Sequence, residues 1–285
     1  RFSDQVHHPL EKALDAQKPL WSEFRVEYGV MEEGWTTARA FFDDTTAVDA
    51  FLEYERSYNR HMDDKTCAAL MIIDYCYVFM LATIPLVAAS GIVPDLAPEH
   101  VALRMFDDRH EHDGEVHNVR RADIRYLSRC FSTDRASLGH HPDATLLSGQ
   151  GALCDAFRVA IENHFSVLVE ALAKRSGLGR PALWRLVRTL SRADGWRSAD
   201  ISTALVRRGS PLYNKQLHFF DLTLHDDNRK PIGSWTFRAR GGCCRYYTVA
   251  EGALCSTCVL KSPAIRDAEL LEKMRKHVAL LTGGQ

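Results

Sequence analysis

Four of the eight cysteines in this sequence fall within sixteen residues, and no other feature has a clearer potential for chemistry. They form a Cys-Cys pair, ten intervening residues and a Cys-x-x-Cys pair: Cys243, Cys244, Cys255 and Cys258. Thiolates bind zinc and iron–sulfur clusters, so four thiols in so short a span can converge on one inorganic centre. Gly252 lies in the intervening segment, where the chain must fold back. The sequence therefore predicts a metal centre near the C-terminus.

The spacing bears on which metal centre this is. Structural zinc usually takes two Cys-x-x-Cys pairs, whereas here one pair is adjacent. Neighbouring side chains diverge along an extended backbone, which makes Cys243 and Cys244 awkward partners for one tetrahedral ion. A two-iron cluster offers two attachment points and accommodates that divergence. The spacing favours a [2Fe–2S] centre, and a zinc-stapled structural module is the alternative.

The cysteine pattern resembles the [2Fe–2S] signature of FhuF-like ferric siderophore reductases. That resemblance implies that Cys243, Cys244, Cys255 and Cys258 are the four cluster ligands and that Tyr247 occupies a position where the family commonly has an aromatic residue. The Val-Leu pair after the last cysteine is also similar. A weaker similarity covers residues 178–184, and the first half of the chain carries no family motif.

Two positions depart from the family pattern. Arg245 stands where an apolar residue usually follows the cysteine pair, and Ser256-Thr257 replaces the Gly-Asp-like pair between the last two ligands. Neither change removes a thiol, so the resemblance still implies cluster binding. Charge and hydrogen bonds near the sulfurs tune the potentials of iron–sulfur clusters, so we expect these changes to affect the potential or the substrate preference.

The resemblance implies an oxidoreductase, specifically a siderophore ferric iron reductase. Such a protein reduces a ferric siderophore, best known as the hydroxamate type, by one electron and releases Fe(II) in the cytoplasm. A [2Fe–2S] redox-sensing or iron-sensing binding protein would use the same cluster and is the second alternative. That class should show a partner-binding or DNA-binding element, and no basic recognition helix is evident in the sequence.

Positive charge gathers around the cysteines. Residues 207–261 contain nine Lys and Arg and four Asp and Glu, an excess of five positive charges in a chain whose net charge is −1. This excess could steer an anionic chelate or an acidic electron donor, or it could simply be a solvated hairpin. We expect Arg238, Arg240 and Arg245 to line the substrate side of the cluster. Candidate donors are a ferredoxin, a flavodoxin, a reductase or a low-molecular-weight thiol.

Composition describes an ordinary globular protein and names no partner. The 285 residues are 46% hydrophobic and 26% charged, which is enough for one large domain with a small appendage. A net charge near zero argues against nucleic acid as a partner. No signal peptide is visible after Arg1, so a cytoplasmic location, with reduced thiols, is expected.

One apolar run tests the expectation that no segment spans a membrane. Residues 75–93 contain no charge and are long enough for a span. Pro85 divides the run, and proline breaks the helical hydrogen-bond ladder. We therefore predict a central core helix that ends or kinks near Pro85, and no integral span, with peripheral membrane association left open.

The chain as a whole predicts an α+β fold. A helix-rich main domain with short hairpins should occupy residues 1–210 and provide the substrate-binding body, and a small [2Fe–2S] domain should occupy residues 211–285. Hydrophobic periodicity predicts helices at 6–16, 45–60, 65–90, 151–174, 181–192, 198–208 and 265–281. Strands or hairpins are expected at 24–30, 101–120 and 216–240, and a loop at 132–148.

Several other residues have metal-binding chemistry but a simpler interpretation. We expect His7-His8 and His140-His141 to be surface residues and the polar stretch 107–113 to be a solvated hairpin tip. The remaining cysteines are predicted to be small core residues: Cys67, Cys76, Cys130 and Cys154. Aromatic residues near the motif are predicted to pack around the cluster: Trp235, Phe237, Tyr246 and Tyr247.

Overall fold

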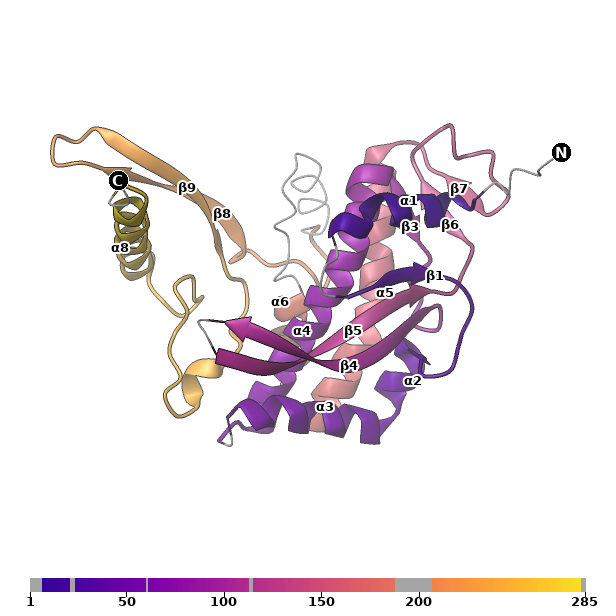
Figure 1. Cartoon of the computed structure of the whole chain (residues 1–285), viewed down its shortest axis with the longest axis horizontal. Helices are drawn as coiled ribbons and strands as arrows, with labels where there is room; N and C mark the ends of the chain where they lie inside the picture. Colours follow the sequence, from indigo (N-terminus) through magenta and orange to yellow (C-terminus); the bar gives the residue numbers. More distant parts are fainter. Residues whose placement is uncertain (1–6, 21–23, 60, 113–114, 188–206, 283–285) are drawn as a thin grey trace.

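A computed structural model describes residues 7–20, 24–59, 61–112, 115–187 and 207–282 (Figure 1). The helical elements are α1 (Pro9–Gln17), η1 (Lys18–Leu20), α2 (Ala38–Asp43), α3 (Thr45–Tyr58), α4 (Asp64–Pro85), η2 (Leu86–Ser90), α5 (Gln150–Ser176), α6 (Arg180–Val187), η3 (Tyr246–Thr248) and α8 (Pro263–Thr282). The strands are β1 (Val26–Tyr28), β2 (Thr36–Thr37), β3 (Ile92–Pro94), β4 (Val101–His112), β5 (Glu115–Tyr126), β6 (Phe131–Thr133), β7 (Ala144–Leu146), β8 (His218–His225) and β9 (Pro231–Ala239). The α+β prediction is confirmed.

The helix α4 forms the centre of the core. Its sequence is apolar nearly all round, and α3, α5 and α6 pack against it. Asp63 caps its first turn by accepting the Thr66 amide at 2.8 Å. The regular helix ends at Pro85, where we expected a kink, and continues as the π-helix η2 to Gly91, whose φ of 65° suits glycine.

The same helical segment is the candidate for a membrane span. Among the described residues, Asp64–Ser90 is the one helical stretch that is long and apolar enough to cross a bilayer. Of its most apolar window, 61% is buried inside the protein. Burial of this kind is what a core helix requires, because the apolar surface already has protein partners.

A long hairpin of β4 and β5 dominates the first sheet, whose strand order is β1-β5-β4-β2. The two strands pair without interruption from Val101↔Tyr126 to His112↔Glu115. The prediction of a polar tip at 107–113 is therefore wrong, because Asp107 to His112 belong to strand β4. A charge pair between the two strands helps to explain why β4 continues through these polar residues: the Arg121 guanidinium lies 2.9 Å from the Asp108 carboxylate.

The predicted loop at 132–148 also contains regular structure. Strand β6 pairs antiparallel with β3 and parallel with β7, which gives a second small sheet. Short strands of three residues carry too little periodicity to be recognised in a sequence. Figure 1 shows this sheet beside α1, at the end of the body away from the C-terminal hairpin.

Two of the residues assigned from the sequence lie in other environments than expected. His8 is buried, with 7% of its surface exposed, because α1 packs it against Tyr28 and the turn that precedes β7. Burial, together with the nearby His141 ring and the Arg129 guanidinium, lowers the pKa of His8. Cys130 is exposed rather than a core residue, since it follows the end of β5 at the surface. The other three isolated cysteines are buried as predicted: Cys67, Cys76 and Cys154.

The C-terminal segment forms a two-stranded hairpin covered by a helix. Strands β8 and β9 pair antiparallel, and α8 packs on β8 (Figure 1). The Arg266 guanidinium lies 3.7 Å above the Phe220 ring, and Trp235 meets His277 edge to face at 6.2 Å. The expected helix at 198–208 lies largely outside the described residues, and the domain boundary near Ser210 stays a prediction.

A buried histidine in the body should make the stability of the protein pH-dependent. His164 bonds the Tyr75 hydroxyl at 2.6 Å and the Leu96 carbonyl at 2.8 Å, and burial lowers its pKa from 6.5 to about 4. The unfolded chain gains this proton near pH 6.5 and the folded one does not, so acid favours unfolding. We predict that His164 removes about 3 kcal/mol from the free energy of unfolding between pH 6.5 and pH 4.

Denaturant titrations across that range measure this contribution. His164→Gln should flatten the dependence, whereas replacement of the exposed His7 by Gln should preserve it. Equal pH slopes in the wild type and His164→Gln would contradict the assignment.

Candidate metal centre

Strand β9 delivers the chain directly to the first two cysteines. After Ala239, Gly241 and Gly242 are buried against the end of α6 and the side chain of Asn214. The Asn214 amide donates to the Gly241 carbonyl at 2.8 Å, and a Cβ on Gly241 would lie 2.1 Å from that amide nitrogen. The close approach requires glycine here, and it fixes the backbone that presents Cys243 and Cys244.

A tight turn then brings the second pair of cysteines back to the first. Arg245 adopts a left-handed φ of 64°, and its amide donates to the Cys243 sulfur at 3.4 Å. The helical turn η3 follows, and the Gly252 amide bonds the Val249 carbonyl at 3.0 Å. A Cβ on Gly252 would lie 2.0 Å from the Tyr246 carbonyl, so the return of the chain depends on this glycine.

The four predicted thiols converge on one site. They line a single small cavity of about 10 Å³, whose other lining residues include Arg240, Tyr246, Tyr247 and Leu254. The Cys258 thiol lies close enough to the thiols of Cys243 and Cys255 to raise the pKa of both. Cys258 is buried, with 5% of its surface exposed, and the other three cysteines are half-buried. The site is therefore open on one side and closed on the other.

The crowding of the thiols opposes their ionisation. Burial raises the pKa of both Cys243 and Cys255, and the neighbouring cysteines raise each further. The Arg240 guanidinium acts in the opposite direction on Cys255, and the Arg245 amide does so on Cys243. Four thiolates at such close quarters need a positive centre between them, which a metal ion or an iron–sulfur cluster supplies.

The body holds this segment through contacts at the start of α4. The Arg245 guanidinium lies 2.7 Å from the Asp63 carboxylate, and the Asn59 side chain donates to the Ala250 carbonyl at 3.0 Å. Val249 is 94% buried and belongs to the hydrophobic core of the body. Burial opposes the shift, but hydrogen bonds from Thr66 and Arg245 hold the pKa of Asp63 below its usual value. Residues 243–258, called the thiol segment below, are thus held on the main body by both polar and apolar contacts.

The three arginines expected near the cluster have different environments. Arg245 is occupied by Asp63, so it anchors the turn. Arg240 lines the thiol cavity. Arg238 is half-buried on β9 close to Cys76, and burial and the charge of Arg240 lower its pKa. Within the described part of the chain, no carboxylate pairs with Arg238.

The aromatic residues near the cysteine motif also differ in whether they lie beside the thiols. Phe237 packs across the hairpin on Phe220, with ring centroids 6.0 Å apart, and does not line the thiol cavity. Tyr246 and Tyr247 line the thiol cavity but keep 41% and 42% of their surfaces exposed. The prediction that aromatic residues surround the thiols therefore agrees with the position of the two tyrosines, whereas Trp235 and Phe237 pack within the hairpin and against α8 and do not line the cavity.

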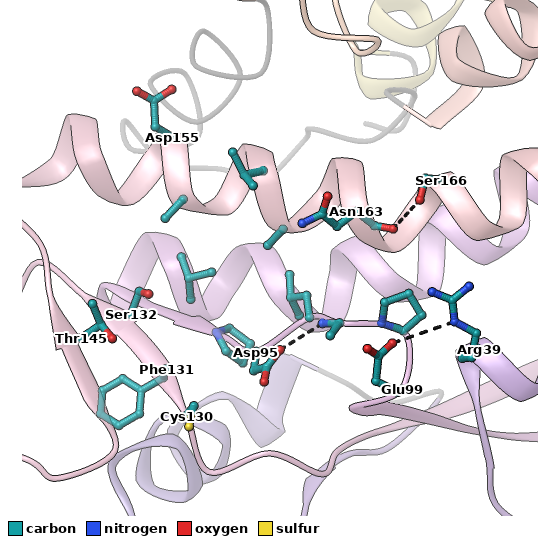
Figure 2. A pocket seen from close by; sticks show the side chains of 18 residues that line it. Arg39, Asp95, Glu99, Cys130, Phe131, Ser132, Thr145, Asp155, Asn163 and Ser166 are labelled. Carbon is teal, nitrogen blue, oxygen red and sulfur yellow. Dashed lines mark hydrogen bonds and ion pairs between the residues drawn. The ribbon is translucent and has the colours of Figure 1, made fainter.

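A much larger cavity in the body is separate from the thiols. It has a volume of about 810 Å³ and lies between α5 and residues 93–99, as Figure 2 shows. Asp95, Glu99 and Asp155 contribute carboxylates, and Asn163 contributes an amide. None of the seven residues predicted for the site lines this cavity.

The donor set fits an all-cysteine iron–sulfur centre, so the fold and the site define an iron–sulfur protein of the α+β class. Residues 240–260 match the family model described as the FhuF 2Fe-2S C-terminal domain. The match includes all four cysteines and confirms the resemblance that their spacing indicated. The chain carries a FhuF-type domain, and its cofactor is a [2Fe–2S] cluster. Comparisons with curated proteins and with solved structures gave no match.

Sequence reasoning found the thiols but missed the residues that position them. Asp63 is a residue type that favours helix N-caps, and it lies just before the long apolar run, so a cap here could be recognised in the sequence. Nothing in the sequence pairs it with Arg245, 182 positions away. Asn214 is likewise isolated in the sequence, and the consecutive glycines at 241 and 242 are the signal from which a close approach of the backbone could have been inferred.

The turn at Gly252 provides a test of this geometry. Gly252→Ala places a methyl group against the Tyr246 carbonyl, so the second cysteine pair should be displaced from the first. We predict that the purified variant retains less than about a fifth of the wild-type iron and visible absorbance per chain. Gly151→Ala, where a Cβ meets nothing within 4 Å, is the matched control. Full cluster content in Gly252→Ala would show that the turn does not hold the site.

Proposed function

We propose that Cys243, Cys244, Cys255 and Cys258 hold the [2Fe–2S] cluster and that the protein is a siderophore ferric iron reductase of the cytoplasm. The observation that carries the proposal is the convergence of these four thiols in one partly open cavity, within the segment that matches the FhuF 2Fe-2S domain. Fe(III) in a hydroxamate siderophore is the proposed substrate, and Fe(II) is the product.

The proposed reaction needs few catalytic groups. When bound, a [2Fe–2S] cluster exchanges one electron at a time. Fe(III) accepts that electron and becomes Fe(II), which hard oxygen donors hold more weakly, so the chelate releases the metal. The electron transfer itself breaks no covalent bond within the siderophore, and the Fe–O bonds dissociate afterwards, while the freed oxygen donors take up protons from water. The protein must therefore only hold the cluster close to a surface at which the chelate can dock.

The open side of the site meets that requirement. Tyr246, Tyr247 and Leu254 border the thiols and are exposed by 41%, 42% and 36%. Aromatic rings with one exposed face suit contact with a compact organic chelate. Cys258, on the opposite side, is buried and keeps water away from one part of the site. We propose that the chelate docks against the tyrosines.

Two arginines at the end of β9 favour an anionic partner beside the thiols. Burial and the charge of Arg240 lower the pKa of Arg238, so the two guanidinium groups repel each other. An anionic group on the chelate, or a carboxylate of an electron donor, would relieve this repulsion. Arg245 has no such role, because Asp63 already neutralises it. The electron donor is proposed to be a ferredoxin, a flavodoxin, a reductase or a low-molecular-weight thiol.

Removing one proposed ligand tests the cluster assignment. Cys255→Ser should lose the visible absorbance of the cluster and the reduction of ferric chelates, because serine leaves one iron without a thiolate. Cys130→Ser is the control, since Cys130 is exposed and lines the separate cavity near α5. Retention of both properties by Cys255→Ser would overturn the ligand assignment. A colourless wild-type protein that contains zinc would favour the structural module instead.

Neutralising one arginine tests the docking surface. The dithionite-reduced protein is mixed anaerobically with a ferric hydroxamate, and Fe(II) is captured by a coloured chelator. We expect about one Fe(II) per chain from the wild type. Arg238→Gln should raise the concentration of an anionic chelate needed for half-maximal rate about tenfold and leave the visible spectrum unchanged. Lys230→Gln, in the hairpin turn, should change neither, and an unaltered Arg238→Gln would contradict the role of this charge.

A further inference from the structure

Two histidines and one aspartate from distant parts of the sequence meet beside α1. His8 caps the start of α1, while His141 and Asp143 lie in the turn between β6 and β7. One potential ligand atom from each lies within 4.8 Å of the others. The His8 Nε2 atom is 3.4 Å from the Asp143 carboxylate, and the two imidazole rings meet at right angles with centroids 4.8 Å apart.

An independent observation points to a ligand at this place. The His8 side chain is 94% buried, and its Nε2 atom, which faces the Asp143 carboxylate at 3.4 Å, makes no well-formed hydrogen bond with the described residues. The ring is held on Tyr28 by stacking at 5.0 Å and on Phe131 edge to face at 5.6 Å. A buried polar atom without a partner is costly and unusual in a folded protein. The packing therefore keeps this nitrogen directed at Asp143 at an energetic cost.

We propose that His8, His141 and Asp143 bind one divalent first-row transition-metal ion, of the class of Zn²⁺ or Fe²⁺. Two imidazoles and one carboxylate form a donor set that such ions prefer, and three protein ligands leave positions free for water or a small molecule. Ligation through Nε2 of His8 moves the ring proton from Nε2 to Nδ1. That exchange gives up the bond from the Leu10 amide to Nδ1, which is long at 3.3 Å.

One cation already competes for the site. The Arg129 guanidinium lies 3.0 Å from the same Asp143 oxygen that faces His8, and 66% of the Arg129 side chain is exposed. An entering metal ion would displace this guanidinium into solvent, where its charge is hydrated. Arg129 should therefore weaken metal binding, and its removal should strengthen it. A merely structural ion pair would predict no such gain.

Metal binding here would join two separate segments of the fold. His8 fixes the N-terminal end of α1, and the other two proposed ligands lie in the turn that joins β6 to β7 in the second sheet. Figure 1 places this region at the end of the body away from the thiol segment, so the site is independent of the [2Fe–2S] cluster. An ion that binds the folded chain and not the unfolded one raises the melting temperature.

The test uses the full-length, cluster-loaded protein. Equilibrium dialysis against Zn²⁺, and anaerobically against Fe²⁺, followed by metal analysis, should give one ion per chain beyond the cluster iron, with a rise in Tm. His8→Asn and Asp143→Asn should each weaken binding at least tenfold and abolish the rise in Tm. Their exposed neighbours provide controls: His7→Asn and His140→Asn should bind like the wild type.

Arg129→Gln provides a measurement that does not depend on the stability of the histidine variants. It should bind Zn²⁺ several-fold more tightly than the wild type. The proposal is overturned if no additional ion binds, if His8→Asn binds as well as the wild type, or if Arg129→Gln binds no more tightly.

Discussion

The mutual repulsion of four sulfur atoms is the interaction on which the C-terminal part of this protein depends. Cys243, Cys244, Cys255 and Cys258 share a cavity of about 10 Å³, and burial together with their neighbours raises the pKa of two of them. The four thiols can ionise together only around a positive centre. The folded turn therefore favours binding of a metal cluster. The backbone has to bring the four sulfur atoms together, and the positive charge of the cluster then offsets the repulsion between the thiolates.

Three features of the surrounding structure bring the four sulfur atoms together. Gly241 and Gly252 permit backbone contacts that a larger residue would block, and the left-handed Arg245 turns the chain after the first cysteine pair. Asp63 then fixes Arg245 to the first turn of α4, the most buried helix of the body. A helix that is buried along most of its length thus supports a polar turn at its N-terminal end. The Arg245–Asp63 ion pair thus connects the turn that carries the cysteines to the N-terminal end of the core helix.

The sequence was informative wherever the determining interaction is local. The spacing of the cysteines predicted the metal centre, Pro85 predicted the end of the regular core helix, and alternation predicted both long hairpins. The sequence was silent where the determining partner is distant. His8 looks like a surface residue because its burial depends on the turn at residues 141–143, and the strands β6 and β7 are too short to show a period. Similarly, Asn214 and Asp63 carry no mark of the contacts they make with the thiol segment.

The electron transfer itself can be observed by Mössbauer spectroscopy. The cluster is built with ⁵⁷Fe, reduced by one electron, and mixed anaerobically with a hydroxamate chelate of ⁵⁶Fe(III), so that only cluster iron contributes to the spectrum. The account predicts one ferric and one ferrous iron before mixing, and conversion of the ferrous component to ferric at the rate at which Fe(II) leaves the chelate. Release of Fe(II) with an unchanged ⁵⁷Fe spectrum, or a protein without a two-iron spectrum, would contradict it.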